Sequence, residues 1–299
     1  MRYRTLGKTN LRVSVIGIGT WQFGGEWAKD FTQAEADAIL DAATECGINL
    51  IDTAECYGPE HLSEKLIGDY LSRRDRSRWI IATKFGHHYK SFMKRDDDFS
   101  VAGVQSQLDG SLKALRVEAI DLYQFHSGSD KIFQNQELWD FLAEQKRAGK
   151  IRHLGASILQ SGSELQAREA AKFGVEALQV FYNRLDCRAE KIYFPHAQRD
   201  NLGILARVPL ASGLLSGKYK SGVSFDTNDV RVTFEHTKLI HDIAEVERLE
   251  KEEVPPGVPM AKWAMAWCLK NPAVTALIPG CKNPEQVKSN ASAAELVAE

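Results

Sequence analysis

A short apolar segment followed by an amphipathic helical segment recurs about eight times along this 299-residue chain. The apolar segments include 48–54 (INLIDTA), 120–126 (IDLYQFH) and 151–157 (IRHLGAS). They are apolar on both faces, as expected of parallel strands covered by helices. A doubly wound open sheet alternates in the same way, but this number of units in this length fits a closed (β/α)8 barrel better. We therefore predict an α/β fold of the TIM barrel type, with an N-terminal β-hairpin, formed by residues 1–299 as a single domain.

The helical segments carry recognisable start and stop signals. Segment 32–47 begins with Thr32 and Glu35 at capping-box spacing and ends at Gly47. Residues 216–232 form a long, polar stretch whose apolar residues follow neither the helical period of 3.6 residues nor the strand period of two. The other predicted helices are 61–75, 101–119, 135–150, 161–174, 188–201, 236–252, 259–272 and 284–295, and the other predicted strands are 78–86, 175–183, 202–210 and 273–280.

Composition excludes several classes of protein. The net charge of −2 gives no basis for a nucleic-acid partner or an anionic membrane surface. Five cysteines without a CxxC pair argue against a disulfide framework and for a reducing compartment. The N-terminus lacks an apolar signal core, and no apolar run approaches the roughly 18 residues of a membrane span. We expect a cytoplasmic protein, and no sequence feature indicates an oligomeric state.

Polar and titratable residues follow the predicted strands, which is where a barrel keeps its chemistry. An isolated lysine, histidine or aspartate at such a place has an ordinary explanation as a loop residue or a turn cap. An acid, a phenol, a lysine and a histidine at neighbouring strand ends of one rim are better explained by a shared site. These four residues are Asp52, Tyr57, Lys84 and His126, and the other strand ends carry Gly19, Thr20, Trp21, Ser157, Gln179, Tyr182, Asn183 and Arg207.

The four titratable groups suit proton donation to a carbonyl oxygen. A tyrosine hydroxyl has an ordinary pKa of about 10, which a neighbouring ammonium group lowers. A carboxylate can hold that ammonium group in place, and a histidine can orient the substrate oxygen. This set supplies no hydride, so the chemistry requires a cofactor.

Metal and dinucleotide motifs are missing from the expected places. His87, His88 and His126 form neither an HxH nor an HExxH pattern, so we predict no metal site. GIGTWQFGG lacks the GxGxxG spacing, which argues against a Rossmann fold. Two late segments, 209–222 and 278–286, offer glycines, lysines and a helix start that could bind phosphate, although each is also an ordinary loop.

The chain resembles the aldo-keto reductase family over essentially its whole length. The matching segments are GIGTWQFGG, GINLIDTAECYG, IIATKFG, IDLYQFH, KIRHLGAS, LARVPLASGLLSGKY and IPGCKNPEQVKSN. The resemblance implies a (β/α)8 barrel that reduces aldehydes or ketones with NADP(H), or in some members NAD(H). The family's catalytic tetrad falls on Asp52, Tyr57, Lys84 and His126, with Tyr57 as the general acid, Lys84 and Asp52 lowering its pKa, and His126 orienting the carbonyl.

Cofactor roles carry over from the resemblance with two departures. Of the family's three nicotinamide carboxamide contacts, Ser157 and Gln179 match, but Ile158 stands where an asparagine is usual. Arg207 stands where an aromatic residue commonly stacks on the nicotinamide, and a guanidinium group can also stack. The resemblance assigns the remaining cofactor contacts to Gly19, Thr20, Trp21, Asp52, Pro209, Leu210, Ser212, Gly213, Leu215, Lys218, Gly280, Lys282, Gln286 and Asn290.

Four aromatic residues near the rim are predicted to shape the substrate pocket: Trp21, Trp27, Phe85 and Tyr89. The substrate would be a small carbonyl compound, and loops of this kind carry no readable code for its identity. A non-catalytic or weakly catalytic NADP(H)-binding regulatory subunit is the alternative function. A barrel isomerase that uses Lys84 as a Schiff-base nucleophile is a further alternative.

Overall fold

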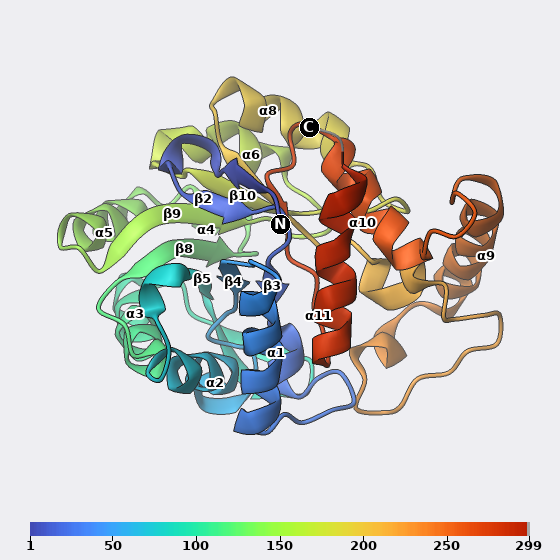
Figure 1. Cartoon of the computed structure of the whole chain (residues 1–299). Helices are drawn as coiled ribbons and strands as arrows, with labels where there is room; N and C mark the ends of the chain where they lie inside the picture. The colour runs from blue at the N-terminus through green and yellow to red at the C-terminus, as the bar shows by residue number, and fades with distance from the viewer. Residues whose placement is uncertain (298–299) are drawn as a thin grey trace.

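Eight parallel strands form one closed sheet in this computed structural model, which describes residues 1–297 (Figure 1). Isolated parallel bridges between Ile16 and Leu277 and between Gly19 and Gly280 join the first strand to the last. The predicted (β/α)8 barrel is confirmed. In spatial order the strands are β3 (Ile18–Gly19), β4 (Leu50–Asp52), β5 (Ile80–Phe85), β8 (Ile120–His126), β9 (Ile151–Ser157), β10 (Ala177–Phe181), β11 (Gly203–Arg207) and β12 (Ala276–Leu277).

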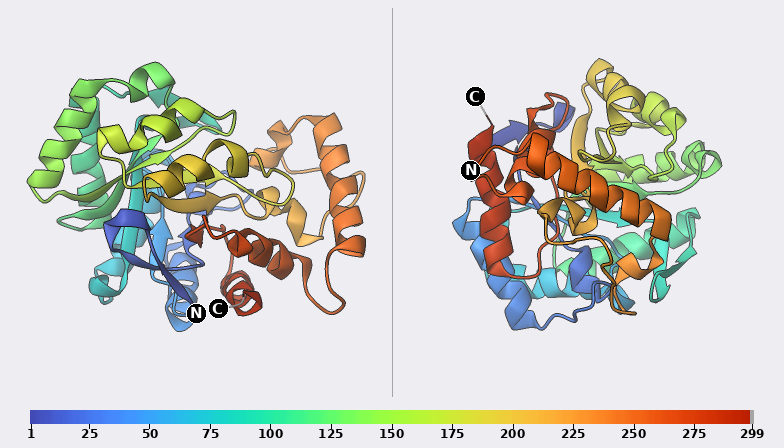
Figure 2. Two further views of the ribbon diagram at one scale, coloured as in Figure 1. Left: turned by 90° about the horizontal axis from the view of Figure 1, so that it is seen from above. Right: turned by 90° about the vertical axis from the view of Figure 1, so that its right-hand side faces the viewer.

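Helices cover the outside of the sheet in Figures 1 and 2. In the left view of Figure 2, α9 stands to one side of the barrel, at the end of a long connection that leaves β11. The helices are α1 (Gln33–Glu45), α2 (Leu62–Leu71), α3 (Val101–Leu115), α4 (Asp130–Phe133), α5 (Gln136–Arg147), α6 (Glu164–Glu169), α7 (Ala189–Ile192), α8 (Phe194–Arg199), α9 (His236–Glu252), α10 (Met260–Lys270) and α11 (Pro284–Ala291).

Local sequence signals predict the start of α1 correctly but miss a break in the helix expected at 188–201. Thr32 and Glu35 form the predicted capping box at the start of α1. The helix predicted at 188–201 is instead two short helices, α7 and α8, that meet at Tyr193. Pro195 has no backbone N–H, and its ring crowds the preceding turn, so a continuous helix is disfavoured there.

A second hairpin was not predicted from the sequence. Strands β6 (His87–Ser91) and β7 (Lys94–Asp97) pair antiparallel directly after β5, where the sequence suggested a loop. Both strands are rich in charged residues and lack the apolar alternation of a half-buried strand. The periodicity that predicted the barrel strands therefore gave no signal for this hairpin.

The N-terminal hairpin, β1 (Tyr3–Thr5) with β2 (Arg12–Ser14), adjoins the end of the barrel at which the parallel strands begin, here called the lower end. Leu6 and Val13 pack in one buried cluster with the lower layer of barrel residues. That lower layer is apolar and consists of Leu50, Ala82, Leu122, Ala177, Leu205 and Ala276. Burial of this apolar surface stabilises the barrel at the end opposite the predicted site.

Two residues further along, the inward-facing position is polar on five of these six strands. Successive side chains of a strand point to opposite faces, so positions two apart share a face. Leu50 is followed on that face by Asp52, and Ala82 by Lys84. On the next strands the same step leads to Gln124, Gln179 and Arg207.

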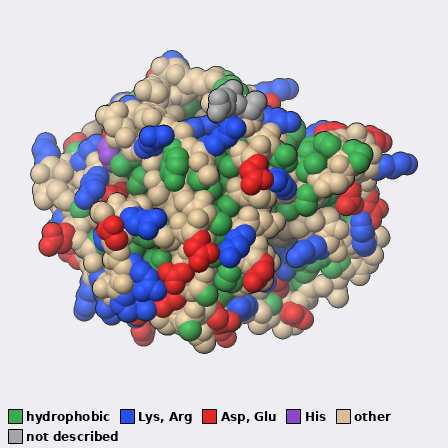
Figure 3. All heavy atoms as spheres, viewed as in Figure 1, with side chains coloured by type: hydrophobic (Ala, Val, Ile, Leu, Met, Phe, Trp, Pro, Cys, Tyr) green, Lys and Arg blue, Asp and Glu red, His purple; other side chains and the backbone are tan. Residues whose placement is uncertain are grey.

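On the face shown in Figure 3, basic and acidic side chains are interspersed. Ion pairs join neighbouring elements at the surface, such as that of Arg73 with Asp37, at 2.7 Å between Nη2 and Oδ2. Among the described residues, no helix is both long and apolar enough to cross a membrane.

Candidate active site

Lys84 lies at the centre of the polar layer and is fully buried. Its ammonium group donates hydrogen bonds to Asp52 Oδ2 at 2.7 Å, to the carbonyl oxygen of Thr53 at 2.6 Å and to the Tyr57 hydroxyl at 3.2 Å. Three donors meet three acceptors, so the charged form is fully satisfied. This is the lysine, aspartate and tyrosine contact that the sequence predicted.

The Asp52 carboxylate is fixed from its other side by two buried amides. Gln179 Nε2 donates to Asp52 Oδ1 at 2.6 Å, and Gln124 Nε2 donates to the same oxygen at 3.2 Å. The two glutamines are also linked, because Gln179 Nε2 lies 3.2 Å from Gln124 Oε1. Sequence reasoning did not select Gln124. Its place two residues before His126 on the same strand face was the signal that could have found it.

Burial and neighbouring charges act in opposed directions on the pKa values of this layer. Burial lowers the pKa of Lys84, but the neighbouring Asp52 and Tyr57 outweigh it, so the pKa lies above its ordinary value. Burial raises the pKa of the Tyr57 hydroxyl, Lys84 opposes this effect, and the net direction is upward. Lys84 therefore acts on Tyr57 as expected, but burial outweighs it, and the predicted net lowering is not found. Both groups hold their protons at neutral pH.

The rings around Tyr57 fix the place of its hydroxyl. The Trp21 ring is stacked on the Tyr57 ring at a centroid distance of 6.1 Å, and the His126 ring meets it edge-on at the same distance. Burial and then the charges of Lys84 and other cations hold the pKa of His126 well below its ordinary range. His126 is consequently a neutral imidazole beside the phenol.

Cys56 contacts this histidine. Its Sγ lies 3.8 Å from His126 Nδ1, and burial raises the pKa of the thiol to about 11. A protonated thiol can donate to Nδ1, which leaves the proton of the neutral ring on Nε2. Cys56, which had no role in the sequence analysis, is thus a contact of the tetrad.

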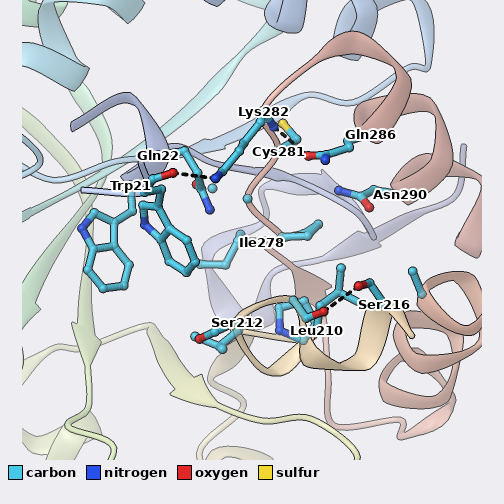
Figure 4. Close-up of a pocket in the computed structure, with 18 of the residues that line it drawn as sticks. Trp21, Gln22, Leu210, Ser212, Ser216, Ile278, Cys281, Lys282, Gln286 and Asn290 are labelled. Atoms are coloured by element: carbon cyan, nitrogen blue, oxygen red, sulfur yellow. Dashed lines mark hydrogen bonds between the residues drawn. The ribbon is translucent and has the colours of Figure 1, made fainter. Parts of the chain in front are cut away.

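A cavity of about 410 Å³ begins at Tyr57 and runs toward α11. In Figure 4, Trp21 lies at one end, Gln286 and Asn290 at the other, and Leu210 and Ser216 lie across from Ile278. All residues predicted to contact cofactor line this cavity except Ser157 and Leu215. Ser157 is buried beside Gln179, at 3.4 Å between Oγ and Oε1, and Leu215 packs in the apolar cluster of α9 and α10.

Four buried polar atoms in the cavity wall have no hydrogen-bond partner among the described residues. They are Gln22 Oε1, Trp27 Nε1, Arg207 Nε and Asn290 Nδ2. Unpaired buried polar groups are costly, so these three donors and one acceptor fit a polar ligand. Ser212 and Gly213, in the turn after β11, have φ values of 57° and 94° and line the cavity.

Two loops pair across one side of the cavity, and we call them the strap. It consists of residues 26–29 and residues 226–231, joined by bonds such as that from Val230 N to the Glu26 carbonyl oxygen at 2.9 Å. Arg231 is paired with Asp229 at 2.7 Å within the second loop and lies 5.6 Å from the Trp27 ring of the first loop. Lys282 Nζ donates to the Trp27 carbonyl oxygen at 2.5 Å. Sequence reasoning missed this element, because its contacts join segments about 200 residues apart without periodicity.

The four predicted substrate-pocket aromatics lie in different places. Trp21 and Trp27 line the cavity. The prediction for Phe85 is wrong, because strand alternation turns it away from Lys84 into the outer core, where its ring packs against Tyr123 at 4.9 Å. Tyr89 lies on β6 under the guanidinium of Arg95 at 5.1 Å and lines neither cavity described here.

A second cavity of about 760 Å³ adjoins the first. The two cavities share four residues, which are Trp21, Arg207, Val208 and Ser212. The rest of its wall comes from the segments after β10 and β11 and from the start of α9. Among the described residues, no cluster of three or more histidine, cysteine or acidic side chains is arranged to hold a metal ion.

A barrel that ends in a lysine, aspartate and tyrosine contact beside a long cavity defines a class of carbonyl oxidoreductase. The family model for the aldo/keto reductase family matches residues 15–299, so the chain belongs to this family. It is an NAD(P)H-dependent oxidoreductase that acts on carbonyl groups.

Sequence relatives and solved structures match nearly the whole length of this chain. An uncharacterised oxidoreductase of Bacillus subtilis, YrpG, is 32% identical over 99% of this chain and 92% of its own length. The NADH-specific methylglyoxal reductase of Escherichia coli is 31% identical over 98% of this chain and 93% of its own. The holo form of aldo-keto reductase AKR11C1 from Bacillus halodurans has a TM-score of 0.80 at 28% identity, covering 99% of this chain and 91% of that one. The glycerol dehydrogenase AKR11B4 of Gluconobacter oxydans has a TM-score of 0.82 at 29% identity, covering 97% and 89%.

Proposed function

We propose that this protein reduces an aldehyde or ketone with NADPH and that Tyr57 is the general acid. The observation that carries the proposal is the Lys84 ammonium group, which is bonded to both Asp52 and Tyr57 where Tyr57 faces the cavity. An acid that holds its proton at neutral pH is matched to an oxygen that gains negative charge.

Proton transfer follows from these contacts. Tyr57 gives its proton to the carbonyl oxygen, and negative charge passes to the phenol oxygen. The Lys84 Nζ, at 3.2 Å, donates a hydrogen bond whose strength rises as that charge develops. Asp52 keeps Lys84 charged throughout. The same bonds argue against Lys84 as a Schiff-base nucleophile, since its pKa is raised and the amine is protonated.

His126 orients the carbonyl oxygen in this proposal. The neutral ring, with Nδ1 facing the Cys56 thiol, keeps its proton on Nε2 as the donor to that oxygen. A neutral donor stabilises the developing oxyanion without competing with Tyr57 for the proton.

The cofactor, when bound, supplies a hydride from C4 of the nicotinamide to the carbonyl carbon. Gln179 commits Nε2 to Asp52, which leaves Oε1 as an acceptor for the carboxamide, beside Ser157. The turn after β11 and Lys218 would hold the pyrophosphate. Gly280 and Lys282, before α11, and Gln286 and Asn290, on α11, would hold the adenosine end.

The choice of NADPH depends on cations at that end. Lys282 and Arg231 line the cavity, and burial followed by the charge of Arg231 lowers the pKa of Lys282. A 2′-phosphate would relieve the repulsion between these cations. One relative, by its name, is specific for NADH, so a kcat/KM that is higher with NADH than with NADPH would overturn this choice.

Arg207 adds a bias between the two states of the cofactor. Its guanidinium beside the nicotinamide would disfavour the positively charged oxidised ring. We expect tighter binding of NADPH than of NADP⁺ by fluorescence titration. Equal dissociation constants would contradict this expectation.

The test is a panel of aldehydes and ketones, including methylglyoxal and 4-nitrobenzaldehyde, followed at 340 nm with each cofactor. Oxidation of NADPH that depends on the carbonyl compound is the expected result. Tight NADPH binding without reduction of any compound would favour a regulatory subunit instead.

A further inference from the structure

Arg207 is a cation without a counter-ion between the two cavities. It ends β11 and lines both cavities. Its Nη2 donates to the Ile158 carbonyl oxygen at 3.1 Å, and its Nε is buried without a partner. No carboxylate of the described residues lies within ion-pair distance of it. Its nearest support is the neutral Phe181 ring, at 5.6 Å from Cζ.

Neighbouring cations differ from Arg207 in this respect. Lys84 is paired with Asp52 at 2.7 Å and Arg95 with Glu26 at 2.5 Å. In the second cavity each basic side chain other than Arg207 has its own acid: Arg188 is paired with Asp186 at 2.7 Å and Lys238 with Asp242 at 2.5 Å.

The other charged groups near the site do not balance Arg207. Glu235 lines the second cavity, but its carboxylate caps α9 by accepting from the N–H groups of Thr237 and Lys238. Lys84, His87, Arg207 and Arg95 all act on His126 with positive charge. The reaction end of the site is therefore electropositive, with one cation left over.

We propose that the anionic partner of Arg207 is the substrate, and that the protein prefers carbonyl compounds that carry a carboxylate. This inference rests on the proposed function. Tyr57 and Arg207 line the same cavity, so one small molecule can reach both groups. The in-plane N–H groups of a guanidinium form a fork that matches a carboxylate, while its face remains available for the nicotinamide. The second cavity has room for the remainder of the molecule.

The test compares each acid with its own methyl ester, so that only the charge changes. The pairs are 4-carboxybenzaldehyde with methyl 4-formylbenzoate, and succinic semialdehyde with methyl 4-oxobutanoate, all followed at 340 nm with NADPH. We expect kcat/KM for the acid to exceed that for the ester by about tenfold to a hundredfold in at least one pair, mainly through KM. Equal or lower values for both acids would overturn the inference. Failure to reduce any of the four compounds would count against the proposed function instead.

Variants separate a role toward substrate from a role toward cofactor. At saturating NADPH, Arg207→Met should bring the acid-to-ester ratio close to one, because both compounds then meet the same bound cofactor and only their charge differs. Arg207→Lys keeps the charge and should keep part of the ratio. Arg199→Met removes an exposed cation at the end of α8 and should leave the ratio unchanged. If Arg207→Met weakens acid, ester and NADPH alike, Arg207 serves the cofactor alone, and the inference is overturned.

Discussion

The polar layer inside the barrel and the strap across the cofactor cavity are held together in different ways. In the polar layer, strand register places Lys84 opposite Gln124, and hydrogen bonds then fix Asp52. In the strap, backbone contacts between distant segments set the positions instead, such as the bond from Val230 N to the Glu26 carbonyl oxygen. The first region is suited to holding reacting groups and the second to holding and releasing a bound molecule.

The largest expected effect is the loss of Lys84. Lys84→Met removes the donor to Tyr57 and leaves Asp52 buried without its cation. We expect kcat/KM to fall by about 10³-fold or more, and the free energy of unfolding in urea to fall by about 3–5 kcal/mol. The double variant Lys84→Met/Asp52→Asn should regain stability without regaining activity. Recovery of both would show that Lys84 serves only to neutralise Asp52.

Removal of Gln124 tests whether the buried amides matter to the chemistry. Gln124→Leu removes one of the two donors to Asp52 Oδ1. We expect kcat to fall by about tenfold to a hundredfold with a smaller change in KM, because second-layer partners orient reacting groups. The neighbour Tyr123 has a buried hydroxyl without a partner, so Tyr123→Phe is the matched control and should keep full activity. Equal losses in the two variants would mean that general packing, not the amide, is responsible.

A smaller effect is expected in the strap. Arg231→Met removes the donor to Asp229 and to the Tyr219 hydroxyl. The dissociation constant for NADPH should rise about tenfold, while kcat at saturating cofactor changes by less than about threefold. Arg248→Met, an exposed ion-paired arginine on α9, controls for the lost charge. A fall in kcat with unchanged cofactor binding would contradict the proposal that the strap binds the cofactor while the polar layer performs the chemistry.

The smallest expected effect is that of pH on reduction. The raised pKa of Tyr57 keeps the acid protonated throughout the neutral range, and the depressed pKa of His126 keeps that ring neutral. We expect kcat/KM to stay level from about pH 6 to pH 9 and to fall only above about pH 10, as Tyr57 loses its proton. A decline centred near pH 7 would indicate that His126, and not Tyr57, is the proton donor.

The same contrast explains how much the sequence could predict. Asp52, Lys84 and His126 were selected because the hydrophobic periodicity and composition of the sequence show where strands end. A barrel brings such strand ends to one rim. Phe85 was misassigned although the same alternation, counted from Lys84, turns it outward. Glu26 and Asp229 could not be found, because the contacts that bring them to the site, with Arg95 and with Trp27, join segments far apart in the sequence.

Substitution of Tyr57 by phenylalanine tests the central claim most directly. Tyr57→Phe removes the one hydroxyl that is proposed to give the proton and keeps the ring that stacks on Trp21. With a carbonyl compound reduced by the unaltered protein, kcat measured at 340 nm should fall by about 10²- to 10⁴-fold. The dissociation constant for NADPH should stay within about threefold of its original value. Retention of full activity by Tyr57→Phe would contradict the assignment of Tyr57 as the general acid.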